Sequence, residues 1–178
     1  MTAALRLRPT LLSDLDFVLA VEQDGVNQPF VTPWERTQHE GSLRFPDARH
    51  FIVEDADGAA GFVILQGCRS PHRAVELKRI VLARARQGRG LGRAAVRGLK
   101  RLAFEQLHAH RFWLDVRALN TRAFELYLSE GFVEEGRLRE SVRVPASLSA
   151  SGWDTLVVMA MLEQEFAARD AAGQEALP

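Results

Sequence analysis

The 178-residue sequence contains a single cysteine, Cys68, and a single tyrosine, Tyr127. One cysteine excludes an internal disulfide framework. No apolar run approaches the roughly 18 residues that a membrane-spanning helix needs, so no membrane partner is expected. The first residues, Met1 to Arg6, lack a charged segment followed by an apolar one, and we expect no secretory signal. These absences favour a cytoplasmic protein.

Neither sign of charge is in excess, because 23 Lys and Arg residues balance 23 Asp and Glu residues. A dedicated nucleic-acid-binding protein normally carries a basic excess, so no nucleic-acid partner is expected. The five histidines are dispersed, and the spacing of His108 and His110 does not place both rings on one helical face. The sequence therefore predicts no metal site.

Apolar residues make up 47% of the chain, which is typical of a globular domain. Alternation, helical spacing and turn residues predict the secondary structure. Strands are expected at 5–8, 51–54, 61–65, 75–82, 112–116 and 155–161, with an extended segment from Phe132; helices are expected over about 13–22, 91–107 and 120–128, with a short irregular one within 23–48. This order predicts one mixed α/β domain over residues 1–162. Residues 163–178 are expected to form a terminal helix or a frayed tail.

A glycine-rich segment, Gln87-Gly88-Arg89-Gly90-Leu91-Gly92, joins the strand at 75–82 to the helix that follows. Glycines let the backbone approach a ligand, and the N–H groups of a first helical turn have no internal partner. Such a junction favours an anion, above all a phosphate, and Arg86 and Arg93 flank it. A tight turn without a ligand is the alternative.

Two other phosphate-binding motifs compete for this segment. The Walker loop is excluded because Gly92 is followed by Arg93 rather than by Lys and Ser or Thr. The dinucleotide-binding fingerprint fits the spacing of Gly90, Gly92 and Ala95, with Asp115 about 20 residues on. That fingerprint usually opens its domain, whereas here strands precede it and too little chain follows for a second half. A nicotinamide-dependent enzyme remains an alternative.

The segment Gln87–Gly92 matches the signature Gln/Arg-x-x-Gly-x-Gly/Ala, and a second element runs from Asn120, at the start of a short helix, through Tyr127 to Gly131-Phe132. With these two elements at this separation, the chain resembles the GNAT superfamily of acyl-CoA-dependent N-acyltransferases. The order of elements across residues 4–162 is similar too. The segment Glu135–Glu140, followed by a strand containing Trp and Asp, most resembles the branch that acetylates protein N-termini and small amines.

The resemblance implies a GNAT-like fold, a mixed and mostly antiparallel sheet flanked by helices, with the strands at 75–82 and 111–116 splayed apart. It also implies acetyl-CoA as the co-substrate. The main chain of the first of these strands would pair with the pantetheine arm, the glycine loop would hold the pyrophosphate, and the Asn–Tyr helix would reach the arm or the sulfur. The residues implicated are Ile80, Val81, Leu82, Gln87, Gly88, Arg89, Gly90, Leu91, Gly92, Arg93, Asn120 and Tyr127.

Direct transfer to an amine within a ternary complex needs positioning, a base, an oxyanion donor and a donor for the leaving thiolate. The resemblance implies Glu76 as the base, eleven positions before Gln87, and alternation places it on one face with Ile80 and Leu82. The alternative for Glu76 is a surface residue paired with a nearby cation. Tyr127 is the expected acid, with a core aromatic as its alternative.

The resemblance places the acceptor in a groove beside the segment after the first helix, where Phe30, Trp34 and Glu35 are the expected contacts. The partner is expected to be a small-molecule or peptide amine. The last strand and the Ala-rich tail offer edges and apolar area for a homodimer. A CoA-binding sensor without catalysis remains the alternative from another functional class.

Overall fold

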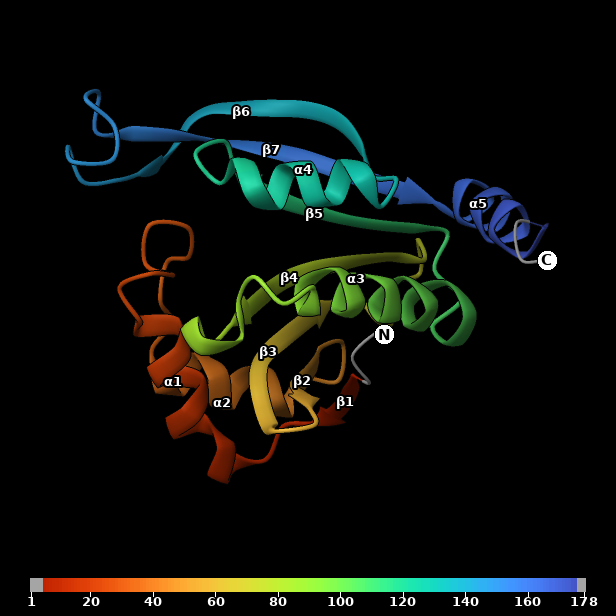
Figure 1. Cartoon of the computed structure of the whole chain (residues 1–178), viewed down its shortest axis with the longest axis horizontal. Coiled ribbons are helices and arrows are strands. Elements are labelled where there is room, and N and C mark those ends of the chain that lie inside the picture. Colours follow the sequence, from red (N-terminus) through yellow and green to blue (C-terminus); the bar gives the residue numbers. More distant parts are fainter. Residues whose placement is uncertain (1–4, 176–178) are drawn as a thin grey trace.

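The computed structural model describes residues 5–175, with side-chain surroundings for residues 5–172. Within that range a seven-stranded sheet lies between helices on both of its faces (Figure 1). The strands are β1 (Arg6–Pro9), β2 (Arg49–Asp55), β3 (Gly58–Gln66), β4 (Ala74–Leu82), β5 (Arg111–Arg117), β6 (Val133–Arg143) and β7 (Trp153–Leu162). The helices are α1 (Leu15–Gln23), α2 (Arg36–Arg44), α3 (Leu91–Arg101), α4 (Thr121–Ser129) and α5 (Glu163–Glu175).

The strands lie in the order β1-β2-β3-β4-β5-β7-β6. Among the described residues only β4 and β5 run parallel, and they pair only over Ala74–Glu76 and Arg111–Trp113. Beyond that point the two strands separate, and Figure 1 shows the sheet opening between them. The predicted mixed, mostly antiparallel sheet with a splayed central pair is therefore confirmed.

A β-bulge in β4 changes which side chains share a face. Ile64 of β3 pairs with Arg79 and Leu65 pairs with Leu77, so Lys78 has no opposite residue. Leu77 and Ile80 consequently contact the same core cluster although three positions separate them. Strict alternation is therefore wrong here, because Glu76 lies on the face opposite to Ile80 and Leu82.

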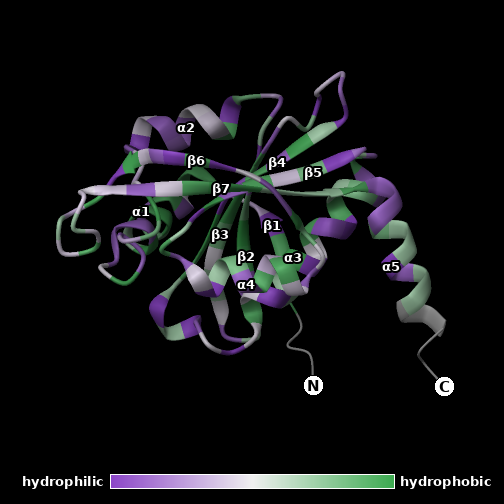
Figure 2. Ribbon diagram, turned by 90° about the horizontal axis from the view of Figure 1, so that it is seen from above, coloured by the Kyte–Doolittle hydropathy of each residue, from purple (hydrophilic) through white to green (hydrophobic). Residues whose placement is uncertain are grey.

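Two apolar clusters form the core, one on each side of the sheet. The larger packs α3 and α4 against the sheet through residues such as Val96, Leu99 and Tyr127. The smaller packs α1 against β3 and β4 through Val18 and Phe62. Figure 2 shows the apolar strands of the sheet between these helical layers. Where the sheet splits, α3 and α4 therefore cover one face and α1 covers the other.

Most predicted elements are confirmed, with local differences at their ends. The helix expected over 91–107 ends at Arg101, and a π-helical turn, Leu102–Gln106, follows it. The irregular segment 23–48 contains α2, and the tail from Glu163 forms α5 as far as Glu175, while residues 176–178 lie outside the described part. The expected edge at the last strand is wrong, because β7 pairs on both sides and β6 is the edge strand. None of the described helices is long and apolar enough to cross a membrane.

Candidate active site

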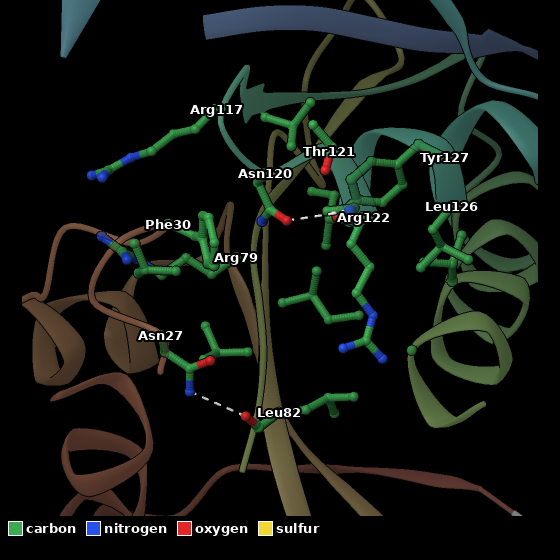
Figure 3. Close-up of a pocket in the computed structure, with 18 of the residues that line it drawn as sticks. Asn27, Phe30, Arg79, Leu82, Arg117, Asn120, Thr121, Arg122, Leu126 and Tyr127 are labelled. Carbon is green, nitrogen blue, oxygen red and sulfur yellow. Dashed lines mark hydrogen bonds between the residues drawn. The ribbon is translucent and has the colours of Figure 1, made fainter. Parts of the chain in front are cut away.

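A cleft of about 960 Å³ occupies the split in the sheet. Its walls come from β4, β5, the glycine-rich segment with α3, the start of α4, and the segment that follows α1 (Figure 3). Many of the implicated residues line it, namely Phe30, Ile80, Val81, Leu82, Gln87, Gly88, Gly90, Gly92, Arg93, Asn120 and Tyr127. Glu76, Trp34, Glu35, Arg89 and Leu91 are not among its lining residues.

The glycine-rich segment turns tightly into α3. Gly88 and Gly90 have φ angles of +77° and +79°, in the left-handed region that other residues rarely adopt. A Cβ built at either position would meet no atom within 4 Å, so the backbone here borders open space. Gly90 is the N-cap of α3, and the N–H groups of the first helical turn therefore lie beside the cleft. This geometry fits a pyrophosphate held by main-chain amides.

The side chain of Gln87 holds the end of β4. Its Nε2 donates hydrogen bonds to the Leu82 carbonyl oxygen at 3.0 Å and to Asn27 Oδ1 at 2.9 Å. Asn27 Nδ2 donates to the same carbonyl at 3.1 Å and to the Val21 carbonyl at 2.8 Å. Asn27 and Gln87 thus fix the end of α1, β4 and the glycine-rich segment relative to one another.

The open edge of β4 presents main-chain groups to the cleft. The Ala83 N–H donates to the Ala60 carbonyl of the β3 side. Because hydrogen-bonded residues alternate along an antiparallel pair, Ile80 and Leu82 direct their N–H and C=O groups the other way, toward the split. The Leu82 carbonyl is already engaged by two side chains, so the free groups are the two N–H donors and the Ile80 carbonyl. An extended ligand arm can pair with this edge as an added strand.

The arginines near the glycine-rich segment are mostly committed to acids of the protein. Arg86 pairs with Asp55 at 3.1 Å and with Asp57 at 2.7 Å. Arg93 pairs with Glu130 at 2.7 Å, although its side chain also lines the cleft. Arg122, which no sequence motif singles out, extends from α4 into the cleft and forms no ion pair with another described residue (Figure 3). Its guanidinium group is therefore not neutralised by an acid of the described chain and could contact an anion in the cleft.

Helix α4 carries Asn120 and Tyr127 to the cleft. Asn120 is the N-cap, and its Oδ1 accepts a hydrogen bond from the Ala123 N–H at 3.2 Å. The Tyr127 ring packs edge-on against Phe132, and its hydroxyl has no hydrogen-bond partner among the described residues. Burial and the nearby charge of Asp115 raise the pKa of Tyr127 above its ordinary value. The hydroxyl therefore stays protonated at neutral pH and is free to donate.

Glu76 lies at the closed end of the split, where β4 still pairs with β5 through Trp113. Its carboxylate is 3.1 Å from the Lys78 ammonium, and only 14% of its side chain is exposed. It shares the α1 face of β4 with Arg79, not the face of the glycine-rich segment.

The segment after α1 contributes Phe30, which lines the cleft and is partly exposed. Trp34 instead packs under this segment, with the Arg79 guanidinium 4.4 Å from its ring centroid. Glu35 is the exposed N-cap of α2. Of the three expected acceptor contacts, the structure therefore brings only Phe30 to the cleft wall.

A buried polar network that the sequence did not reveal supports this segment. Glu22, which is fully buried, lies 2.7 Å from Arg79 and 3.0 Å from His39, and accepts a hydrogen bond from the Trp34 N–H. His39 in turn contacts His50 at 3.3 Å. Since these residues lie far apart in the chain, only the folded structure brings them together. The described residues contain no group of three or more His, Cys, Asp or Glu side chains suited to a metal ion.

The sequence is similar to those of known acetyltransferases. The Acetyltransferase (GNAT) family matches residues 17–132. The chain is 38% identical over 93 residues to the spermidine N(1)-acetyltransferase of Vibrio cholerae, a match covering 52% of this chain and 53% of the relative. It is 33% identical over 130 residues to the mycothiol acetyltransferase of Jonesia denitrificans, covering 68% and 40% respectively. The matches thus span about half or less of these two relatives.

Solved structures match over most of the chain. The crystal structure of the Vibrio cholerae spermidine N-acetyltransferase in complex with CoA and spermine has a TM-score of 0.81 and 26% identity, covering 92% of this chain and 98% of that one. A dodecameric structure of that enzyme has a TM-score of 0.77 and 27% identity, covering 93% and 97%. The splayed sheet described above is therefore a shared architecture.

Proposed function

We propose, because the chain belongs to the Acetyltransferase (GNAT) family, that it transfers an acetyl group from acetyl-CoA to a primary amine by direct attack in a ternary complex. One observation carries the proposal. A single cleft joins the open amides at the start of α3, the free main-chain edge of β4 and the unpartnered Tyr127 hydroxyl. These are the parts that binding a pyrophosphate, aligning an extended arm and assisting a leaving thiolate require.

The protein's groups would hold acetyl-CoA by main-chain contacts. The N–H groups of Gly88 to Gly92 face the expected pyrophosphate position, and Arg122 adds a cation beside them. Ile80 and Leu82 offer N–H donors to the pantetheine arm and to the acyl oxygen. When bound, acetyl-CoA supplies a thioester that an uncharged amine can attack.

The proton balance defines what the side chains must do. The amine nitrogen forms a bond to the acyl carbon as the carbon–sulfur bond breaks, and the amine gives up a proton while the thiolate leaves. Because the pKa of Tyr127 is raised, full proton transfer to a thiolate with a pKa of about 8–9 is uphill. We therefore assign Tyr127 a hydrogen bond to the departing sulfur.

Glu76 is the proposed base, acting through water on the ammonium form of the acceptor. Its place on the α1 face supports this role, because the segment after α1 forms the acceptor side of the cleft. The alternative is that Glu76 has a structural role, which its ion pair with Lys78 favours. Phe30 is the proposed acceptor contact, and Trp34 and Glu35 would act on the acceptor only by holding this segment in place.

Two alternatives remain as outcomes of the test. A CoA-binding module without catalysis would use the same loop and the same edge of β4. The nicotinamide-dependent alternative has less support, since a dinucleotide-binding fold needs a parallel, doubly wound sheet and β4–β5 is the sole parallel pair among residues 5–175.

The biological setting is also a proposal. The relatives are named for spermidine and mycothiol acetylation, which supports a small-molecule amine as the acceptor; a protein N-terminus is the second candidate. The exposed edge strand β6, with exposed Val133 and Leu138, supports a homodimer or a larger homo-oligomer. The need for acetyl-CoA supports a cytoplasmic location, which cell fractionation would test.

A two-step experiment tests the activity. Acetyl-CoA is first titrated by calorimetry, and a panel of amines is then assayed for release of the CoA thiol. Saturable binding with amine-dependent thiol release supports the proposal. Binding without release from any amine favours the non-catalytic module, and protection by NAD but not by CoA would revive the nicotinamide alternative.

A further inference from the structure

The acceptor side of the cleft carries an unusual set of charges. Asp115 and Arg117 are two residues apart on β5 and therefore point to the same face of the sheet. Arg79 of β4 points to that face as well, because it reaches Glu22 of α1. All three line the cleft, and no sequence motif marks any of them as an acceptor contact.

Arg79 is held in a nearly dry environment. Its side chain is 10% exposed, one guanidinium nitrogen lies 2.7 Å from Glu22, and the group stacks over Trp34. Its Nε is buried without a hydrogen-bond partner. Burial lowers the pKa of Arg79, and the positive charge of Arg117 acts in the same direction. Since Arg79 lines the cleft and has one carboxylate in direct contact, an anion in the cleft would stabilise its charge.

Arg117 reaches the same segment from the other side of the split. It donates to the Pro29 carbonyl and to Thr32 Oγ1, both at 2.7 Å. Both acceptors are neutral, and Asp154, the acid that opposes the burial effect on its pKa, forms no ion pair with it. Figure 3 shows the side chains of Arg79 and Arg117 extending toward the same side of the cleft, near Phe30.

The charges on this wall do not balance. Two guanidinium groups converge on the segment after α1, while the only carboxylate in direct contact with either, among the described residues, is Glu22. Glu22 also contacts His39, so its negative charge is shared. Asp115 and Asp154 also act on Arg79 and Arg117 through their charges but contact neither, so two guanidinium groups side by side favour an anion placed directly beside them.

Asp115 provides the opposite charge a short distance away. It is exposed to the cleft and forms no hydrogen bond or ion pair with another described residue. Its charge acts on both Tyr127 and Arg79, raising the pKa of the first and opposing the lowering of the second. An ammonium group beside Asp115 would lie near the hydroxyl proposed to face the sulfur.

We infer that the acceptor is an amine that also carries an anionic group, with its ammonium at Asp115 and its anion at the Arg79–Arg117 wall. This inference rests on the proposed acetyl transfer and names its substrate class. A carboxylate or a phosphate would satisfy the arginines, whereas spermidine, for which the Vibrio cholerae relative is named, has only cationic groups. On this inference the chain differs from that relative in the acceptor that it uses.

Matched acceptor pairs test the inference directly. Leucine is compared with isopentylamine, β-alanine with propylamine, and O-phosphoethanolamine with ethanolamine, with spermidine as a polycation. We expect at least one anionic member to exceed both its partner without the anionic group and spermidine by tenfold or more in kcat/KM. The carboxylate and phosphate pairs show which anion is used.

The outcomes separate this inference from the proposed function. If acetyl-CoA fails to bind, the proposed function fails. If acetyl-CoA binds and no anionic amine exceeds its partner, the substrate class is wrong and the CoA site stands, whether or not spermidine or the amines without an anionic group react. Calorimetry with acetyl-CoA is therefore run on every protein tested.

Variants locate the two subsites. Asp115→Asn, an exposed change, should raise KM for the preferred acceptor tenfold or more and leave acetyl-CoA affinity unchanged. Arg117→Gln should reduce the preference for the anionic member, and Arg117→Lys, which keeps the charge, should restore part of it even if the glutamine variant folds poorly. Arg101→Gln removes an exposed charge on α3 as a control. A parental KM in Asp115→Asn, or an unchanged preference for the anionic member in a folded Arg117→Gln, would overturn the assignment.

Discussion

The side-chain amide of Gln87 donates a hydrogen bond to the main-chain oxygen of Leu82, at 3.0 Å. This contact closes the end of β4 against the glycine-rich segment that begins α3. It leaves the amides of that segment as the anion donors, and the Gln87 side chain as the brace that positions them. We therefore expect the Gln87 side chain to position the glycine-rich segment rather than to contact a phosphate directly.

Replacement of Gly90 by aspartate tests the anion site. A ligand that binds only the folded state stabilises it by about 2.7 kcal/mol at a hundred times its dissociation constant, so acetyl-CoA should raise the melting temperature of the parent. Gly90→Asp places a negative charge beside the expected pyrophosphate and should abolish that rise. Gly152→Asp, at another positive-φ glycine in the β6–β7 loop, should retain it. A parental response from a folded Gly90→Asp protein would remove the loop from the CoA site.

Tyr127→Phe removes one hydroxyl and keeps the buried ring. If the hydroxyl donates a hydrogen bond to the sulfur only as charge develops, kcat should fall about 10²–10³-fold, as for the loss of one preorganised donor. Acetyl-CoA affinity, measured by calorimetry, should change little. Normal kcat under conditions where chemistry limits the rate would reduce Tyr127 to a packing residue.

Glu76→Gln removes a carboxylate and preserves its shape. If Glu76 accepts the amine proton through water, the defect in kcat/KM should shrink as the pH approaches the pKa of the amine, because the substrate then loses its proton unaided. The measurement is a pH profile of the variant against the parent. A defect that stays constant with pH would show that Glu76 supports structure or Lys78 instead.

His50 should make folding stability fall in mild acid. Burial, together with the charges of His39 and Arg79, lowers the pKa of His50 to about 4, whereas an unfolded histidine titrates near 6.5. Between these values the unfolded chain binds the extra proton, so the free energy of unfolding drops as the pH falls from about 6.5 to 4. The full effect is a few kcal/mol.

Denaturant titrations across this pH range measure the effect. His50→Gln should flatten the pH dependence of the unfolding free energy between pH 6.5 and 4. His72→Gln, at an exposed histidine, is the matched control and should keep the parental slope. An equal slope in all three proteins would exclude His50 as the acid-sensitive group.

Self-association should use the edge strand β6. Light scattering at tens of micromolar should give a mass at least twice the 19.9 kDa of the chain. Leu138→Glu places a charge on the exposed edge and should lower that mass. A monomeric mass for the parent protein would contradict the proposed oligomer.

The sequence predicted the parts of the fold that depend on neighbouring residues. The glycines at the start of α3 and the Asn120 cap of α4 are local patterns, and both elements begin where these patterns indicate. The β-bulge at Lys78 depends on pairing with β3, and no local pattern reveals it. For that reason Glu76 was expected on the wrong face of the sheet.

Residue patterns do not predict the Arg79–Arg117 wall of the cleft, for the same physical reason. Arg79 looks like an ordinary polar position in a strand until Glu22 of α1 is brought 2.7 Å from it. Arg117 likewise is brought to this wall by its hydrogen bond to the Pro29 carbonyl, which its place in the sequence does not reveal. Contacts between side chains of two distant segments cannot be predicted from residue spacing. A candidate anion site made of main-chain amides can be, because its glycines form a local pattern.

Transfer of a labelled acetyl group from acetyl-CoA to the nitrogen of an acceptor tests the central claim most directly. Mass spectrometry of the amine product is run beside an assay of the released thiol, with the parent protein and Tyr127→Phe. The account predicts equimolar N-acetylated amine and free CoA from the parent, with a much slower rate from the variant. Acetyl-CoA that binds tightly yet delivers its label to no amine in the panel would contradict it.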